Sequence, residues 1–126
     1  MSTAKSDATG YPVARAEVTD MTLSSTTRIP TTHGSRYIQR LCKHRSHNLA
    51  VEFTPLTGAV IFPRDARGAD WPGEARLFLQ AHADNLECRL EASAAGQLEA
   101  LKDAVASHLD RFAVKEGALH FDWQDA

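Results

Sequence analysis

Between residues 34 and 47 the hydrophobic positions recur at the spacing of an α-helix. At 100° per residue, one arc of this segment carries four apolar side chains: Tyr37, Ile38, Leu41 and Cys42. Thr31 or Thr32 precedes the segment and can supply the oxygen of an N-cap. The pattern predicts a helix that starts at Gly34, ends near His47 and packs its apolar side on a core.

The chain then changes to alternation between apolar and polar positions, which is typical of strands buried on one face. The first strand is expected to turn Leu49, Val51 and Phe53 inward. Turn residues and an Asp84-Asn85 hairpin signal separate the later strands, and a polar loop is expected at 64–74. The expected strands of this run cover residues 49–53, 59–62, 77–81 and 86–92.

A second helix is predicted after Ser93, which can act as its N-cap. Its apolar stripe is formed by Leu98, Leu101, Val105, His108, Leu109 and Phe112. We interpret His108 as a core histidine with one hydrogen-bond partner rather than as a ligand. Beyond this helix, alternation at Leu119, Phe121 and Trp123 predicts a last strand.

With a short extended piece at residues 27–30, the expected order is β-α-β-β-β-β-α-β. Strands linked by hairpins need an antiparallel sheet, so we predict an α+β fold, a mostly antiparallel sheet with two helices on one face. Residues 26–126 would form this single domain, and residues 1–25, rich in small and polar residues, a flexible N-terminal tail. The residues expected to be buried are Leu41, Val51, Leu90, Leu101, Leu109 and Phe121.

Composition excludes several classes of protein and adds one feature. The 126 residues contain neither a secretory leader nor an apolar run long enough to span a bilayer, so a cytoplasmic location is expected. The net charge is −2, but residues 21–63 carry five bases and one acid, whereas residues 64–126 carry seven bases and twelve acids. Such asymmetry is typical of a face for an anionic partner, or of two faces of one domain that attract each other.

The positive charge gathers on the first helix, on the arc opposite its apolar side. Six cationic or titratable residues share this arc without an acid among them: His33, Arg36, Arg40, Lys43, His44 and His47. Like charges four residues apart destabilise a helix by a few tenths of a kcal/mol. The pattern favours a site for an anionic ligand or an acidic partner, because arginine binds carboxylate and phosphate bidentately and histidine gains charge as the pH falls. The simpler alternative is a solvated face whose charge is compensated by acids at Glu87 and Glu91 or in the 99–110 helix.

Two other uses of this helix stay open. His33, His44 and His47 could serve as metal ligands or proton carriers, although three neighbouring cations oppose a divalent ion and no metal is assigned. A weak nucleic-acid binder would need more aromatic residues along the stripe than Tyr37. The two cysteines lie on apolar faces and are expected to be buried, inert thiols. Phosphate-binding, dinucleotide-binding and nucleophile-elbow motifs are absent from the sequence, so no cofactor is predicted and a binding module is favoured. An enzyme that uses His33, His44 and His47 stays open as the alternative.

Several of these residues resemble the signature of the bacterial domain of unknown function 2218 family. The resemblance covers residues 26–123 and rests on His33-Gly34-Ser35-Arg36-Tyr37, Leu41-Cys42-Lys43-His44-x-x-His47, Leu90-Glu91-Ala92 and Val105-x-x-His108-Leu109-x-Arg111-Phe112. It implies a fold similar to one repeat of the TATA-binding protein, and no activity. It also implies an iron context, because similar domains are found beside or fused to siderophore-interacting flavin reductases. The chain departs from the pattern at Arg45, where the family usually has an aromatic residue, and in the long 64–74 loop.

Overall fold

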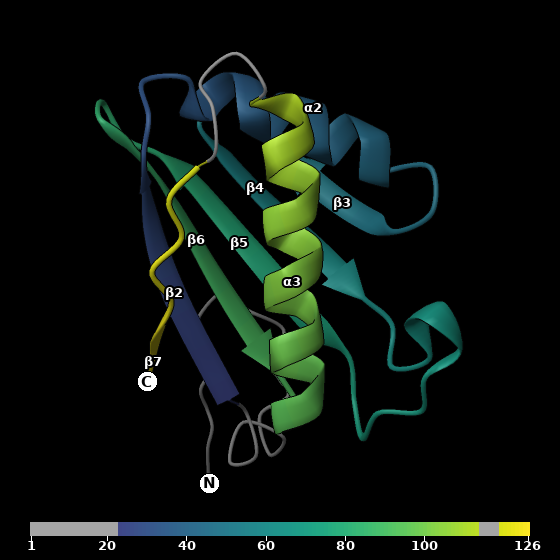
Figure 1. Cartoon of the computed structure of the whole chain (residues 1–126). Coiled ribbons are helices and arrows are strands. Elements are labelled where there is room, and N and C mark those ends of the chain that lie inside the picture. Colours follow the sequence, from purple (N-terminus) through teal and green to yellow (C-terminus); the bar gives the residue numbers. More distant parts are fainter. Residues whose placement is uncertain (1–22, 114–118) are drawn as a thin grey trace, which may run out of the picture.

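A computed structural model describes residues 23–113 and 119–126, which form one sheet with two helices on the same side of it (Figure 1). The elements in chain order are β2 (Leu23–Pro30), α2 (Gly34–Arg45), β3 (Ala50–Phe53), β4 (Thr57–Phe62), a 3-10 turn (Ala66–Gly68), β5 (Ala75–Ala81), β6 (Asn85–Ala92), α3 (Ala95–Phe112) and β7 (Gln124–Asp125). The expected α+β class is therefore confirmed. No helix in the described part of the chain has the length and apolarity needed to cross a membrane.

The six strands are ordered β3-β4-β5-β6-β2-β7, and every neighbouring pair is antiparallel. β5 and β6 are hairpin partners, as expected, with Ala81 opposite Leu86. β2 pairs with β6 along its whole length, from Leu23 opposite Ala92 to Pro30 opposite Asn85. The first strand is thus eight residues long, twice the extended piece at 27–30 that local patterning indicated.

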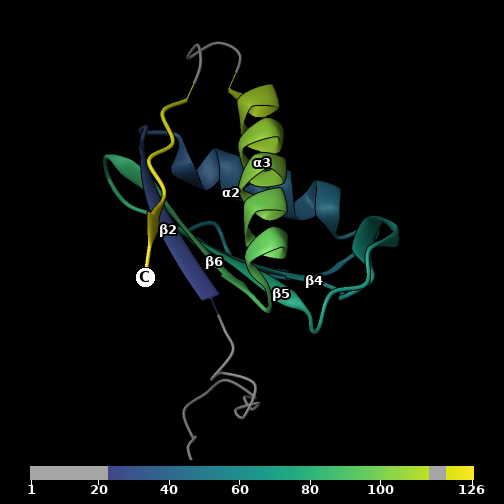
Figure 2. The ribbon, with the colours of Figure 1, turned by 60° about the horizontal axis from the view of Figure 1, so that its bottom comes forward.

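Both helices cover one face of the sheet, and the core lies between them and the strands. α2 lies across β3, β4 and β5, while α3 packs over β6 and β2 (Figures 1 and 2). Alternate strand positions supply the sheet side of the core, among them Val60, Leu77, Leu79, Cys88 and Leu90. The other alternation of the same strands faces away from both helices, on the second face of the sheet.

Three of the six expected core residues, Leu41, Leu90 and Leu109, are buried. Val51, Leu101 and Phe121 are only partly buried against the core. Phe53, which was expected to point inward, is 40% exposed. Its strand, β3, lies at the edge of the sheet, so it has a neighbouring strand on one side only.

The C-terminal strand was predicted in the wrong place. Leu119, Phe121 and Trp123 are outside any strand and pack as an extended segment against the core. The strand β7 follows them and pairs with Ser25 and Thr26 of β2. The backbone N–H of Asp122 donates to the Thr27 hydroxyl at 2.9 Å rather than to a carbonyl of a neighbouring strand. The strand therefore begins only after this residue.

An ion pair ties the C-terminal strand to α3. Lys102 Nζ lies 2.8 Å from Asp125 Oδ1 and 2.9 Å from Glu99 Oε2. The hydrogen bond to Asp125 raises the pKa of Lys102, and the same bond lowers the pKa of Asp125, with a smaller contribution from Ser25. Both shifts favour the charged pair that anchors this end of the chain.

The expected boundary of the N-terminal tail also needs correction. Residues 23–25 were assigned to the tail, but they begin β2. The remaining part of the proposed tail, residues 1–22, lies outside the described residues. The expected end of the first helix moves as well, because α2 ends at Arg45 and Ser46 is its C-cap.

Neither predicted cap is the N-cap residue of its helix. His33 is the N-cap residue of α2. The Thr31 hydroxyl accepts a hydrogen bond from the backbone N–H of His33 at 3.0 Å, two residues along the chain. Ala94 is the N-cap residue of α3. Ser93 instead joins Gln97 and Gly73 in a hydrogen-bond network that fixes the loop before β5 to the start of α3.

Candidate functional site

The helix α2 has one buried and one exposed side, as its sequence predicts. Its buried side consists of Gly34, Tyr37, Ile38, Leu41 and Cys42. The surface here called the basic face consists of Arg36, Arg40, Lys43 and His44 on the opposite side of α2, together with the N-cap residue His33 and with His47, which lies just beyond the C-cap Ser46. All six residues of the basic face are exposed. The apolar packing of α2 on the sheet therefore determines that the cations point to solvent.

The basic face extends along the whole length of α2. At about 1.5 Å of rise per residue, roughly 16 Å separate His33 from His44 along the helix axis. His33 is the N-cap residue, and its ring meets the Tyr37 ring edge-on at 6.4 Å between centroids. The first turn of α2 contains no acid, whereas the last turn contains Lys43, His44 and Arg45. A surface of this length can contact several groups of an extended partner at once.

Among the described residues, no ion pair provides the expected compensation of this charge by nearby acids. Glu87 pairs with Arg28 and His82, and Glu91 pairs with Arg89. In α3, Glu99 pairs with Lys102. Within residues 23–113 and 119–126, the ion pairs include no contact to Arg36, Arg40 or Lys43. Three of the acids proposed to neutralise α2, Glu87, Glu91 and Glu99, are thus paired with other cations.

The structure does not gather the three histidines of the metal-binding alternative. The described residues contain no group of three or more histidine, cysteine or carboxylate side chains that could hold a metal ion. His33 lies at the opposite end of α2 from His44 and contacts Tyr37. His44 instead lies beside His108 of α3, with 6.2 Å between the ring centroids. The expectation that His33, His44 and His47 act as one ligand set is therefore not supported by their positions.

His108 has the core-facing role that the sequence predicts, with one addition. It is half-buried, and its Nδ1 lies 2.7 Å from the Ala104 carbonyl oxygen, which accepts a hydrogen bond when Nδ1 is protonated. Its neighbour His44 belongs to the other helix. A helical wheel describes one helix at a time, so this contact between α2 and α3 has no signal in the sequence.

The two cysteines are buried, as expected, and they are not nucleophiles at neutral pH. Burial raises the pKa of Cys42 to about 11. Burial, and secondarily the charge of Glu87, raises the pKa of Cys88 still further. Because the thiolate is the reactive form, both residues act as small apolar side chains of the core.

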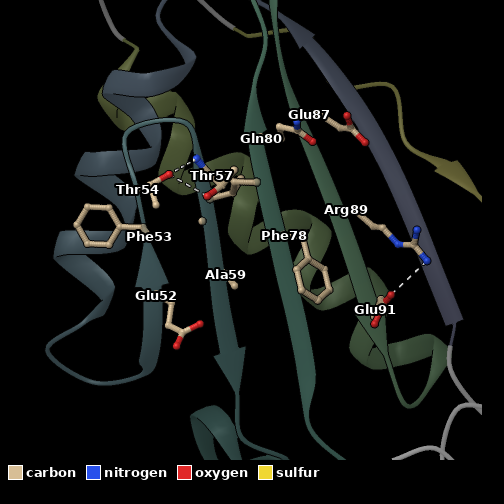
Figure 3. Close-up of a pocket in the computed structure, with 12 residues that line it drawn as sticks. Glu52, Phe53, Thr54, Thr57, Ala59, Phe78, Gln80, Glu87, Arg89 and Glu91 are labelled. Carbon is tan, nitrogen blue, oxygen red and sulfur yellow. Dashed lines mark hydrogen bonds and ion pairs between the residues drawn. The ribbon is translucent and has the colours of Figure 1, made fainter. Parts of the chain in front are cut away.

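A second surface, which the sequence analysis missed, lies on the side of the sheet that faces away from both helices. A hollow of about 890 Å³ is lined by residues from β3, β4, β5 and β6 (Figure 3). Its floor includes Ala59 and Phe78, and Glu52 and Arg89 stand at opposite sides. The alternation within each strand indicates which side chains face away from the core. Only the strand register shows which of these side chains are neighbours.

Comparison with known proteins places the chain among bacterial proteins without an assigned activity. The model of a family described as "Uncharacterized protein conserved in bacteria (DUF2218)" matches residues 26–124. The NMR structure of PA4090 from Pseudomonas aeruginosa is similar, with 31% sequence identity and a TM-score of 0.58. The match covers 82% of this chain and 95% of that protein. Among curated proteins, none matches the chain.

Proposed function

The chain belongs to this DUF2218 family of bacterial proteins, and on that premise we propose that it is a non-enzymatic binding module whose basic face recognises an acidic protein surface. One observation carries the proposal: all six residues of the basic face are exposed, and no ion pair of the described residues involves its arginines or its lysine. The positive charge is thus available to a partner.

The helix bears a cost for this arrangement. Arg36 and Arg40 stand four residues apart, as do Arg40 and His44, and each like-charged pair destabilises a helix by a few tenths of a kcal/mol. Exposed charge contacts contribute about 0–1 kcal/mol each, so such a face binds through several contacts together. Its length favours an extended row of carboxylates over one small anion.

The partner's context comes from the family resemblance. Similar domains accompany siderophore-interacting flavin reductases, so an acidic surface of such a reductase is the first protein to test. A small anionic ligand, such as a carboxylate-bearing siderophore, is the alternative, and citrate serves as its probe. The acidic protein surface and the small anion differ in the number of contacts that they can make. A row of carboxylates can contact both ends of the basic face, whereas a small anion contacts one part of it.

The double substitution Arg36→Ala with Arg40→Ala is expected to weaken binding without unfolding the domain. With hexaglutamate as probe, we expect a loss of about fivefold to thirtyfold, equivalent to about 1–2 kcal/mol for two charge contacts. Stability should stay within about 0.5 kcal/mol of the wild type because both side chains are exposed. Isothermal titration and thermal melts measure the two quantities.

A matched variant, Arg28→Ala with Arg64→Ala, removes the same charge from β2 and the loop after β4, where both side chains are exposed. It should retain most of the affinity for hexaglutamate. Equal losses in the two double variants would mean that net charge alone drives binding, and would contradict a site on α2. Unfolding of the Arg36/Arg40 variant would instead show that these arginines are structural. Tighter binding of citrate than of hexaglutamate would favour the small-anion alternative.

A further inference from the structure

The outward side of α3 carries three carboxylates on one stripe, here called the acidic row: Glu99, Asp103 and Asp110. At 100° per residue these positions fall within about 40° of one another around the helix. All three residues are exposed. The buried residues Val105 and Leu109 lie on the other side of the helix, so the acidic row points away from the sheet.

The acidic row keeps most of its negative charge within the domain. Glu99 Oε2 lies 2.9 Å from Lys102 Nζ, but this lysine also lies 2.8 Å from Asp125, so one cation serves two carboxylates. Asp110 accepts a hydrogen bond from a backbone N–H, a neutral donor that leaves its charge in place. Among the described residues, neither Asp103 nor Asp110 takes part in an ion pair.

The basic face of α2 and the acidic row match in length and in spacing. Arg36 and Lys43 stand seven residues apart on α2. Asp103 and Asp110 stand seven residues apart on α3, so each pair spans about 10 Å at 1.5 Å of rise per residue. The whole acidic row rises roughly 16 Å, as the basic face does. Two such helices lying side by side can therefore bring cations and carboxylates together at several positions.

Small side chains on and beside the acidic row allow another helix to approach it. Ala106 lies on the row between Asp103 and Asp110, and the exposed residues Ala100 and Ser107 lie beside it. Helices pack about 8–10 Å apart, at a distance set by the side chains at the contact. Short side chains at this position favour the lower end of that range.

The basic face and the acidic row lie on the same side of the molecule. α2 and α3 both cover one face of the sheet and pack their buried sides on it (Figures 1 and 2). Both charged surfaces point away from the sheet, and no ion pair of the described residues joins them. Two copies that face each other across a two-fold axis would bring α2 of each copy against α3 of the other.

We propose that the acidic surface recognised by the basic face is the acidic row of a second copy of this chain, in a weak symmetric dimer. This dimer rests on the function proposed for α2, whose partner it identifies. Charge complementarity favours this partner, because six cationic or titratable residues on one helix meet three carboxylates on the other. Any other acidic protein that binds α2 competes with the second copy for the same surface.

Sedimentation equilibrium of the wild-type chain tests for the dimer. We expect a monomer–dimer equilibrium with a Kd on the order of 0.1 mM at low ionic strength, because exposed charge contacts are individually weak. At about 1 M salt, where charges are screened beyond about 3 Å, the dimer should weaken at least about tenfold. A chain that stays monomeric at about 1 mM and low ionic strength overturns the proposal, as does a dimer that does not respond to salt.

Charge reversal on each helix identifies the two surfaces. Arg36→Glu with Lys43→Glu makes α2 acidic, and this variant should be monomeric because like charges then face each other. Asp103→Lys with Asp110→Lys makes α3 basic and should have the same effect. An equimolar mixture of the two variants should dimerise about as strongly as the wild type, because opposite charges then meet at both contacts. A mixture of folded variants that stays monomeric contradicts the proposal.

The control variant is Glu52→Lys with Asp65→Lys, which makes the same change of charge as the α3 variant at exposed positions outside both helices. It should dimerise with a Kd within about threefold of the wild type. Equal losses in the control and in the α3 variant would show that net charge alone governs association. If the α3 variant fails to fold, a dimer that survives Arg36→Glu with Lys43→Glu still overturns the proposal.

Hexaglutamate separates the dimer from the function proposed for α2. If the basic face binds both, saturating hexaglutamate should convert the wild-type dimer into monomers. A chain that is monomeric but binds hexaglutamate at α2 retains the proposed function and rules out the second copy as its partner. A dimer that persists under saturating hexaglutamate bound at α2 would show that the copies meet through another surface.

Discussion

Replacing Gln97 with methionine is expected to lower the free energy of unfolding by about 2–3 kcal/mol. Gln97 is only 2% exposed, although it is polar. Its Oε1 accepts the Ser93 N–H at 2.7 Å and the Ser93 hydroxyl at 2.6 Å, and its Nε2 donates to the Gly73 carbonyl at 3.0 Å. Methionine has a similar length but makes none of these three hydrogen bonds. It leaves the Ser93 N–H without its partner, while the Ser93 hydroxyl can still donate to the Gly73 carbonyl. An unsatisfied buried polar group costs about 1–3 kcal/mol, and each lost hydrogen bond adds to that cost.

Urea denaturation measures this loss, and Gln39→Met is the matched control. Gln39→Met makes the same change of side chain at an exposed position of α2, where the Gln39 Nε2 donates to the Ser35 hydroxyl at 3.0 Å. The control should stay within about 0.5 kcal/mol of the wild type. If Gln97→Met were as stable as Gln39→Met, the network between α3 and the loop before β5 would not contribute to folding.

Replacing Gly58 with alanine is expected to destabilise the domain by about 1–3 kcal/mol, the usual cost of overpacking a core. A Cβ at this position of β4 would lie 2.9 Å from the Cys42 sulfur and 3.2 Å from Ile38 Cγ2. Both neighbours belong to the buried side of α2, so the helix would have to move away from the sheet. In an unobstructed strand the same substitution stabilises by roughly 0.5–1 kcal/mol, so the sign of the effect is informative.

A double-mutant cycle isolates this contact. In the background of Cys42→Ala, which removes the sulfur, Gly58→Ala should cost at least about 1 kcal/mol less than in the wild type, because residues in contact are not additive. Guanidinium unfolding of the four proteins gives the coupling energy. Additive effects would contradict the close approach of α2 to β4 at Gly58.

The sequence predicted the elements whose pattern is local. The 3.6-residue period of Tyr37, Ile38 and Leu41 fixes the buried side of α2, and the alternation of Leu86, Cys88 and Leu90 fixes that of β6. The exposure of the basic face follows from the same period. These features depend on positions close together in the chain, so no knowledge of the tertiary structure is needed to find them.

Features that depend on distant pairings were missed or misplaced. β2 extends to Leu23 because β6 pairs with all of it, although residues 23–25 are not strongly apolar. The C-terminal strand is displaced to Gln124–Asp125 because Asp122 donates to Thr27, a residue 95 positions earlier. The hollow at Ala59 and Phe78 likewise requires the register of four strands. Spacing within one segment carries no information about any of these contacts.

The docking role proposed for α2 is tested most directly by mapping hexaglutamate binding on the wild-type chain with amide chemical shifts at low and physiological ionic strength. We expect the largest shifts in residues 33–47, and a weaker affinity at about 0.15 M salt, where exposed charges are screened beyond roughly 8 Å. Amides around Glu52, Ala59 and Phe78, on the other side of the sheet, should change little. Shifts that are absent from α2, or an affinity that does not depend on salt, would contradict recognition through its basic face.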